Sequence, residues 1–161
     1  MYVDFSELPK NAKVWIFQST RKFTDDEILK INELLISFVA NWKDHGKNVT
    51  GSFIIKYQQF IVIALDNNER NVPGCVTDAS IRVLREIEGL YHVDLLNKFN
   101  TTYRENGSIN IVKLAEFQKL VKESKITSDT IVFNGMVSSV KDFESLWEVP
   151  AIQSWHQRYF N

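Results

Sequence analysis

The first part of the chain shows two patterns of hydrophobic and polar residues, one typical of a strand and one typical of a helix. Residues 13–18 (KVWIFQ) are apolar on both faces, as expected for a strand inside a sheet. Thr24-Asp-Asp-Glu27 then has the composition of a capping box, in which the threonine hydroxyl and the glutamate carboxylate bind backbone amides at a helix start. Apolar residues follow at helical spacing up to His45-Gly46, where the glycine can end a helix. The pattern predicts a strand followed by a long helix.

The next segments predict a hairpin, a second helix and a further strand. Residues 52–57 alternate between apolar and polar, and residues 59–65 are almost continuously apolar, so we expect two strands joined by a tight turn. Residues 77–91 have the spacing of an amphipathic helix that starts at a Thr-Asp cap. A strand over 98–105 would complete a βαββαβ order. This order is typical of the ferredoxin-like α+β fold, in which two helices cover one face of an antiparallel sheet.

The remaining residues predict a smaller lobe of hairpin, helix and strand. Asn106-Gly107 favours a two-residue hairpin turn, and residues 112–124 carry apolar side chains at helical spacing. Residues 130–133 then predict a strand, and residues 139–147 a short helix that begins at a serine cap. The expected division is a ferredoxin-like lobe over 1–102 and a small α+β lobe with a C-terminal tail over 103–161. With neither repeats nor a low-complexity linker, we expect the lobes to pack as one compact unit.

Composition narrows the classes of function. The chain has 161 residues, and 19 basic against 20 acidic residues give a net charge of -1, which argues against general binding of nucleic acid. Its apolar runs are too short to span a bilayer, and the first residues lack the apolar segment of a secretion signal, so no membrane insertion is expected. Cys75 is the single cysteine and there are three histidines, so we expect no internal disulfide, no structural metal and no cofactor. A reducing cytoplasm is the predicted location.

The predicted topology suggests one candidate binding site. If the strands ending at Gln18 and Leu65 are parallel neighbours, both run into helix N-termini at the same edge of the sheet. Two positive helix ends and a guanidinium there would bind an anion or hold a thiolate. The alternative is that Thr77 and Asp78 only cap their helix. In that case Arg21 is solvated or paired with Asp25. The candidate ligand-binding residues are Gln18, Ser19, Arg21, Cys75, Thr77, Asp78 and Ser80.

Cys75 is also the candidate nucleophile of a thiol-dependent enzyme. A reactive thiolate needs a base within hydrogen-bond reach. The predicted topology puts His45 and His92 at the opposite edge of the sheet from Cys75. His156, in the C-terminal tail, is the remaining candidate partner.

The four tryptophans carry large apolar area with one donor each, which is typical of core and lobe-interface residues. If Trp147, Trp155 and Tyr159 were exposed together, a surface for a protein partner would be the better interpretation.

Several motifs give the whole chain a resemblance to a known family. They are residues 8–19 with Arg21, Trp42 with His45-Gly46, residues 74–80, and Trp147 with the Ser154-Trp155-His156 tail. With these the chain resembles a small Bacteroidetes-type bacterial family often catalogued as "ABC transporter ATPase".

The residues themselves do not support ATP hydrolysis. The nearest approach to a P-loop, residues 41–48, lacks the first glycine and the final Ser/Thr, and it closes a helix instead of opening one. Residues 60–66 mimic the apolar strand and terminal aspartate of a Walker B motif, a pattern that any buried strand before a turn can show. We therefore expect no ATPase activity.

Residues 103–136 resemble GYF-like bacterial adaptor modules, in the order of their hairpin, helix and strand and in the segment from Lys125 to Met136. The resemblance implies a small adaptor fold. The Gly-Tyr-Phe signature is absent, and Asn110-Ile111 stands where Gly-Pro is usual. The sequence thus favours a non-enzymatic binding or adaptor protein for a small anion, a peptide or a protein partner, with a thiol-dependent enzyme centred on Cys75 as the alternative.

Overall fold

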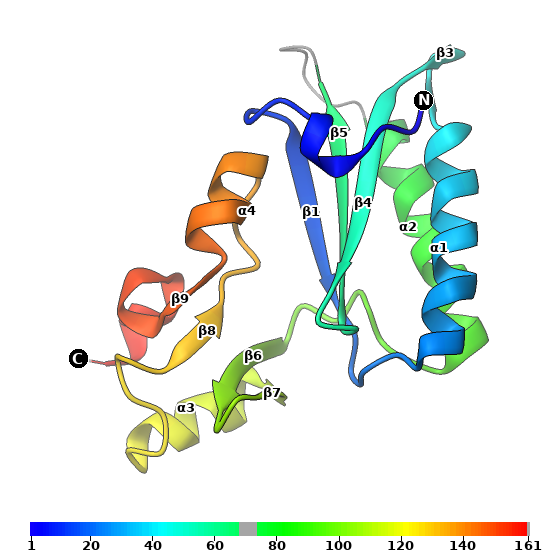
Figure 1. The fold of residues 1–161 in the computed structure, drawn as a ribbon. Coiled ribbons are helices and arrows are strands. Elements are labelled where there is room, and N and C mark those ends of the chain that lie inside the picture. Colours follow the sequence, from blue (N-terminus) through cyan, green and yellow to red (C-terminus); the bar gives the residue numbers. More distant parts are fainter. Residues whose placement is uncertain (68–73, 161) are drawn as a thin grey trace. The chain divides into compact units, whose positions relative to one another are not determined.

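The computed structural model describes residues 1–67 and 74–160, with the backbone alone at residues 74 and 75. The fold is mixed α and β, as predicted (Figure 1). The chain forms two compact units. Unit 1 contains Met1–Leu96 together with Ser138–Val140, and unit 2 contains Asn97–Val137 and Lys141–Asn161. Among the described residues, no helix is both long enough and apolar enough to cross a membrane.

Unit 1 is built on a three-stranded sheet with the order β1-β5-β4, in which both neighbouring pairs are antiparallel. The helices α1 and α2 lie on the same face of this sheet (Figure 1). Its elements are η1 (Phe5–Glu7), β1 (Lys13–Gln18), α1 (Asp25–Ala40), β2 (Lys43–Asp44), β3 (Lys47–Asn48), β4 (Thr50–Lys56), β5 (Phe60–Asp66) and α2 (Gly74–Tyr91).

The start of α1 is where the capping box predicts it, and its end is not. The amide of Glu27 donates to Thr24 Oγ1 at 3.2 Å, and the amide of Thr24 donates to Glu27 Oε1 at 2.9 Å. The helix ends at Ala40, before the expected stop at His45-Gly46. Both of these residues have positive φ, at 48° and 80°, because they form the turn between β2 and β3. The glycine therefore serves a hairpin and not a helix C-cap.

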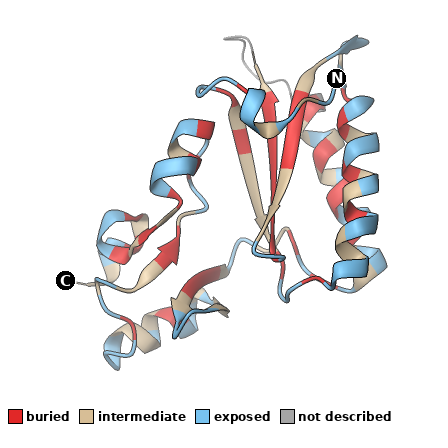
Figure 2. Cartoon of the chain, in the orientation of Figure 1, coloured by how far each residue is buried: buried red, intermediate tan, exposed pale blue. Residues whose placement is uncertain are grey.

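The core of unit 1 lies between the helices and the sheet. Strand β5 is the central strand and is buried from Phe60 to Leu65 (Figure 2). Alternate β5 residues join the apolar sides of α1 and α2, and each fully buried aliphatic side chain stabilises the fold by about 1.5–3 kcal/mol. The buried cluster includes Ile31, Leu35, Val39, Ile61, Ile63, Leu65, Val76, Leu84 and Ile87.

Both edges of this sheet are covered by short segments of chain. Along β4, the amide of Val3 donates to Gly51 O at 3.1 Å, and the amide of Gly51 donates to Met1 O at 3.0 Å. Along β1, the amide of Val14 donates to Ser138 O at 3.1 Å, and the amide of Val140 donates to the carbonyl of residue 12 at 3.0 Å. These bonds occupy backbone groups that an exposed edge would offer to another chain.

The fourth strand of the expected ferredoxin-like sheet does not join unit 1. Strand β6 (Asn100–Glu105) forms at the predicted place but pairs with β7 (Ser108–Lys113) and β8 (Ile131–Phe133) in unit 2. Asn106 and Gly107, with φ of 51° and 80°, close the β6–β7 hairpin over two residues, so β6 meets a partner next to it in sequence. The boundary expected between residues 102 and 103 lies inside β6, whereas the units divide after Leu96.

Unit 2 contains a four-stranded antiparallel sheet with the order β7-β6-β8-β9. Its other elements are α3 (Leu114–Lys122), α4 (Val140–Leu146, whose first residue belongs to unit 1), β9 (Glu148–Pro150), η2 (Ala151–Gln153) and η3 (Trp155–Tyr159). Helix α3 buries Phe117 completely, within a cluster that includes Tyr103, Ile126, Val132 and Ala151.

Candidate functional site

The parallel strand pairing behind the expected anion site is wrong. Strand β1 pairs with β5 in the antiparallel sense, with Gln18 opposite Phe60 and Lys13 opposite Leu65. After α1 the chain enters β4, and the tight hairpin then returns it as β5, which lies between β1 and β4 and runs against both. The end of β1 therefore lies beside the start of β5, so the two strands lead to opposite ends of the sheet.

The expected site residues are separated as a consequence. The loop after β1 contacts the last turn of α2, where Arg21 Nη2 donates to Tyr91 O at 2.8 Å. Thr77, Asp78 and Ser80 lie in the first half of the same helix. From Thr77 to Tyr91 the helix rises about 21 Å at its usual 1.5 Å per residue. Gln18, Ser19 and Arg21 thus do not meet Thr77, Asp78 and Ser80, and the Cys75 side chain lies outside the described residues.

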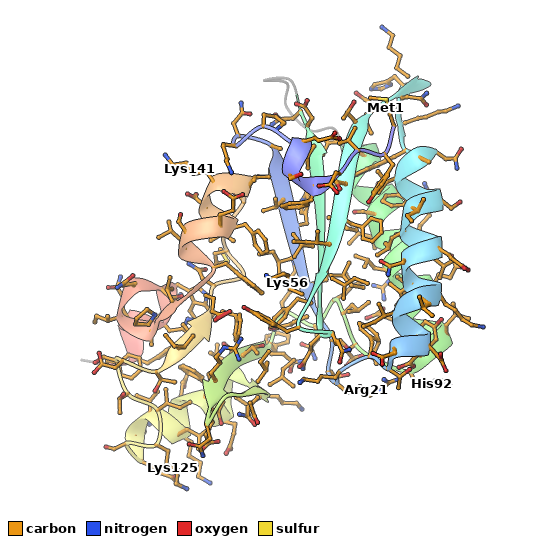
Figure 3. All side chains as sticks on the ribbon, in the orientation of Figure 1. Met1, Arg21, Lys56, His92, Lys125 and Lys141 are labelled. Atoms are coloured by element: carbon orange, nitrogen blue, oxygen red, sulfur yellow. The ribbon has the colours of Figure 1, made fainter. Side chains whose placement is uncertain are left out.

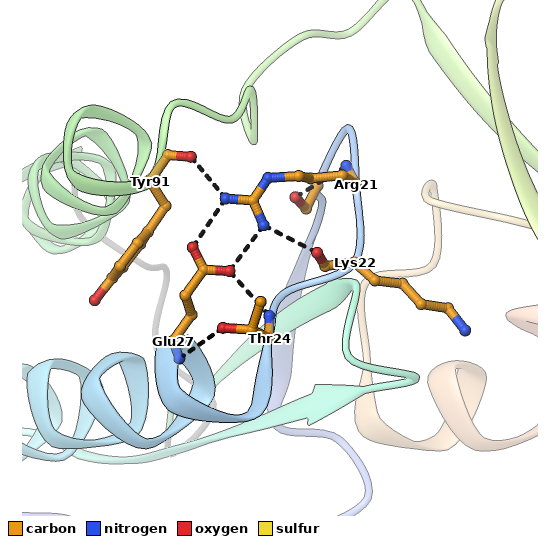
Figure 4. A network of polar contacts seen from close by, with 6 residues as sticks. Arg21, Lys22, Thr24, Glu27 and Tyr91 are labelled. Carbon is orange, nitrogen blue, oxygen red and sulfur yellow. Dashed lines mark hydrogen bonds and ion pairs between the residues drawn. The ribbon is translucent and has the colours of Figure 1, made fainter.

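Arg21 is held by protein acceptors (Figure 4). Its Nη1 and Nη2 donate to Glu27 Oε1 and Oε2, both at 2.8 Å, and Nη1 also donates to Lys22 O at 3.0 Å. We call this arrangement, with the Tyr91 carbonyl, the Arg21 clasp. The hydrogen bonds to Glu27 raise the pKa of Arg21 above its ordinary value, and those from Arg21 are the main cause that lowers the pKa of Glu27 to about 2.

The partner of Arg21 differs from the Asp25 that the sequence suggested. Asp25 Oδ1 accepts a hydrogen bond from Gln58 Nε2 at 2.8 Å, so it connects α1 to the β4–β5 turn. Glu27 has a double role, because the same carboxylate completes the capping box and receives the guanidinium. The clasp joins the start of α1 to the end of α2, which is a structural role.

Two of the other expected site residues, Ser19 and Ser80, have local bonding partners. Ser19 is buried, its amide donates to Gln59 O at 2.8 Å, and Gln59 Nε2 donates back to Ser19 O at 3.0 Å. Ser80 Oγ donates to Thr77 O at 2.7 Å within α2. Because α2 begins at Gly74, Thr77 and Asp78 lie inside the helix and do not cap it, contrary to the sequence-based prediction.

His45 does not lie at the opposite end of unit 1 from the start of α2. Trp42 Nε1 donates to Val76 O at 3.0 Å, which fixes the chain entering β2 against the first turns of α2. His45 follows β2 directly and is exposed. The prediction that His45 and Cys75 lie at opposite edges of the sheet is therefore wrong. The side chain of Cys75 itself lies outside the described residues. His92 follows the other end of α2, near Arg21 (Figure 3).

A groove between α1 and α2 brings several kinds of side chain of unit 1 together. Its volume is about 800 Å³. Leu34, Phe38, Trp42 and Val83 supply apolar surface, and polar and charged side chains surround them. The lining residues that the structure describes are Leu34, Ser37, Phe38, Asn41, Trp42, Lys43, His45, Ala79, Arg82, Val83 and Glu86. We call this the α1–α2 groove; sequence reasoning missed it, although apolar residues four apart on both helices were a usable signal.

A second hollow of about 460 Å³ lies at the C-terminal end of α2. Two of its polar side chains stabilise the loop that follows the helix. Glu88 Oε2 accepts from the amides of Leu95 at 2.8 Å and Leu96 at 3.3 Å, and Thr20 Oγ1 accepts from the amide of Asp94 at 3.2 Å. The side chains of Glu88 and Thr20 therefore stabilise the loop after α2.

The C-terminal tail places His156 in the core of unit 2. Its Nε2 lies 2.8 Å from Thr101 Oγ1 and its Nδ1 lies 2.8 Å from Ser154 Oγ, and the ring is fully buried. The ring stacks on Trp155 with centroids 3.7 Å apart and lies 5.0 Å from Phe117. Burial, and to a smaller extent Arg158, lowers the pKa of His156 to about 4. Both nitrogens are occupied, so this histidine does not offer a base to Cys75.

Trp147, Trp155 and Tyr159 do not form an exposed aromatic patch. Trp147 is 3% exposed and packs between Phe133 and Phe143. Trp155 and Tyr159 are partly buried, and Tyr159 packs on the Phe117 cluster. The joint exposure that a partner surface at these residues required is absent.

Among the side chains that the structure describes, in residues 1–67 and 76–160, no three His, Cys, Asp or Glu come together as a metal site. Comparison of the chain with protein-family models, curated proteins and solved structures finds no match.

Proposed function

We propose that the protein is a non-enzymatic binding or adaptor protein and that its partner binds in the α1–α2 groove of unit 1. The observation that carries this proposal is the groove itself, which combines an apolar floor with charged side chains at its rim. Ligand sites in proteins typically have this composition, a mostly apolar surface with a few polar groups that fix orientation.

The bonding of the other candidate groups supports a binding role. Arg21 and Glu27 are engaged in the clasp, and His156 is buried between two hydroxyls. These groups stabilise the fold, whereas Lys43 and Arg82 are exposed at the groove.

We also propose that unit 2 is an adaptor module of the GYF-like kind and that unit 1 is a relative of the ferredoxin-like fold. The order of the β6–β7 hairpin, α3 and β8 supports the first, and the order β1, α1, β4, β5, α2 supports the second. We further propose that the protein is related to the bacterial family often catalogued as "ABC transporter ATPase", that it has no ATPase activity, and that it is located in the cytoplasm.

A ligand screen on the full chain tests the binding role. Anions, nucleotides and peptides are screened by thermal shift, and each hit is repeated on Ser37→Trp, which places a large side chain on an exposed groove position. A groove ligand should raise the melting temperature of the wild type and lose its effect in this variant. Hits that stabilise both proteins equally would remove the groove as the binding site.

The alternative function is a thiol-dependent enzyme centred on Cys75. The observation that favours it is the position of Cys75 in the first turn of α2, where the helix dipole stabilises a thiolate. Because the chain has one cysteine, the pH dependence of its alkylation by iodoacetamide reports on this thiol alone. A thiol that titrates near the ordinary value of about 8.5 would argue strongly against catalysis.

A further inference from the structure

We infer that the occupant of the α1–α2 groove is an amphipathic helix of a partner protein, with acidic residues flanking its apolar face. This inference rests on the proposed binding function and specifies the class of partner. Three features of the groove carry it: the spacing of its apolar residues, the kind of backbone they can accept, and the sign of the charges around them.

The apolar residues of the groove follow the helical repeat on both walls. Leu34, Phe38 and Trp42 are four residues apart along and just beyond α1, and Ala79 and Val83 are four residues apart on α2. Side chains at this spacing form a row along a helix surface. Two such rows create a channel parallel to the helices, into which the apolar side chains of a third helix fit.

The groove suits a helix better than an extended peptide. An extended peptide must find partners for its backbone amides and carbonyls, and an apolar floor provides none. Part of the polar lining is already used, since Asn41 Nδ2 donates to Ser37 O at 2.8 Å. A helix satisfies its own backbone and needs only to bury one face. From Leu34 to the end of α1 at Ala40 the wall is about 9 Å long, and Trp42 lengthens it further, which corresponds to roughly two turns of the occupant.

The charges favour an acidic occupant. Lys43 and Arg82 are exposed at the groove, against the carboxylate of Glu86 among the described lining residues, and His45 Nε2 lies 3.5 Å from Asp44 Oδ1. Lys43 and His45 lie beyond the C-terminal end of α1, and Glu86 lies one turn after Arg82 on α2. Acidic residues of the occupant should therefore lie towards Lys43 and Arg82. The pairs would be exposed, so they select the partner and its orientation more than they add affinity.

A pair of synthetic peptides tests the inference on the full-length chain. The acidic peptide has about 14 residues, long enough for helix formation on binding, with Leu at positions i, i+3, i+4 and i+7 and Glu and Ala elsewhere. The second peptide has Lys at every Glu position. Amide chemical shifts of the ¹⁵N-labelled protein are followed during each titration. We expect the acidic peptide to shift the amides of Leu34, Phe38, Ala79 and Arg82, and to bind more tightly than the basic peptide.

Charge-reversal variants sharpen the test. Arg82→Glu should weaken the acidic peptide about tenfold and improve the basic one, by loss of an attractive charge and gain of a repulsive one. Lys22→Glu is the matched control, with the same change in net charge at the opposite end of α1, and should leave both affinities unchanged. The amide spectrum of each variant shows whether its fold is intact.

Three results would overturn the inference: equal affinity for the two peptides, shifts outside the groove, or no shifts at millimolar peptide. The proposed binding function has a separate readout. If the acidic peptide fails while another ligand stabilises the wild type and not Ser37→Trp, the groove is a binding site for a different class of ligand. If no ligand distinguishes these two proteins, both the inference and the proposed function fail.

Discussion

The guanidinium of Arg21 connects two parts of unit 1 that are far apart in sequence. It lies between the carboxylate of Glu27 at the start of α1 and the carbonyl of Tyr91 at the end of α2. Bidentate pairing of this kind is stronger than an ordinary surface ion pair, because both donors are aligned with both oxygens. Solvent screening reduces its contribution, since the Arg21 side chain is 43% exposed.

Arg21→Ala should lower the free energy of unfolding by about 1 kcal/mol near neutral pH. The pKa of Glu27 is about 2 in the folded protein against 4.5 ordinarily, so its contribution is complete above pH 4.5 and is lost as the pH falls towards 2. The difference between wild type and variant should shrink over the same range in urea unfolding experiments. Arg85→Ala, at a more exposed ion pair of 3.6 Å, is the control and should have little effect. A difference that persists undiminished at pH 2 would contradict the role assigned to Glu27.

His156 should make unit 2 less stable in mild acid. The histidine is neutral in the folded protein because its pKa is lowered from 6.5 to about 4. Between these values the unfolded chain binds a proton that the folded chain excludes, so stability is full above pH 6.5 and declines as the pH falls towards 4. The decline attributable to this residue should be on the order of 3 kcal/mol.

Unfolding of wild type and His156→Gln, measured across this pH range, checks the prediction. The variant should be less stable at neutral pH and should show a shallower pH dependence. His92→Gln makes the same substitution at an exposed histidine of unit 1 and is the control. Parallel pH profiles for His156→Gln and the wild type would show that His156 is not the responsible group.

At the scale of elements, strand β4 of unit 1 packs very closely against β5 and against Trp42, and local sequence preferences do not reveal this close packing. Gly51 in β4 allows the backbone to pass close to β5 and to the Trp42 ring. A Cβ at this position would lie 2.9 Å from Ala64 O and 3.3 Å from two ring atoms of Trp42. Gly89, near the end of α2, has open space where its Cβ would be.

Gly51→Ala and Gly89→Ala should therefore have opposite effects. The first forces a backbone oxygen or a buried indole to move and should cost about 1–3 kcal/mol, as overpacking does. The second replaces a glycine in a helix and should stabilise by about 0.5–1 kcal/mol. Thermal unfolding of the two variants beside the wild type measures both. Equal melting temperatures for the two variants would contradict the close approach at Gly51.

At the scale of the whole molecule, unit 1 is completed by a segment that follows most of unit 2 in the sequence. Ser138–Val140 covers the edge of β1, so the first 96 residues do not contain all of unit 1. Val140 is also 2% exposed, so its side chain contributes to the buried core of the chain.

A fragment ending at Leu96 should be less stable than the full chain by a few kcal/mol, from roughly one kcal/mol for each lost hydrogen bond and the burial of one valine. Amide hydrogen exchange separates local from global effects. The amide of Val14, which loses Ser138 as its acceptor, should exchange rapidly in the fragment, while the amide of Ile63 in the central strand remains protected. Slow exchange of Val14 in the fragment would show that the edge does not depend on this segment.

The resemblance and the composition favoured a binding or adaptor protein. The structure moved its candidate site from the ends of two strands to the α1–α2 groove. The predicted anion site needed two neighbouring strands to be parallel, which conflicts with the antiparallel sheet expected from the same βαββαβ order, and the structure pairs these strands antiparallel. The groove lies beside the bond from Trp42 to Val76, which joins the end of the first predicted helix to the residue just before the second.

The sequence by itself determined the features that depend on near neighbours. The capping box at Thr24 and Glu27, the buried character of β5 and the two-residue turn at Asn106-Gly107 involve groups a few residues apart, whose conformation local physics restricts. Only the tertiary structure decided the return of Ser138–Val140 to unit 1 and the transfer of β6 to unit 2. These depend on which distant surfaces bury each other best, because burial is not directional and is compared over the whole chain.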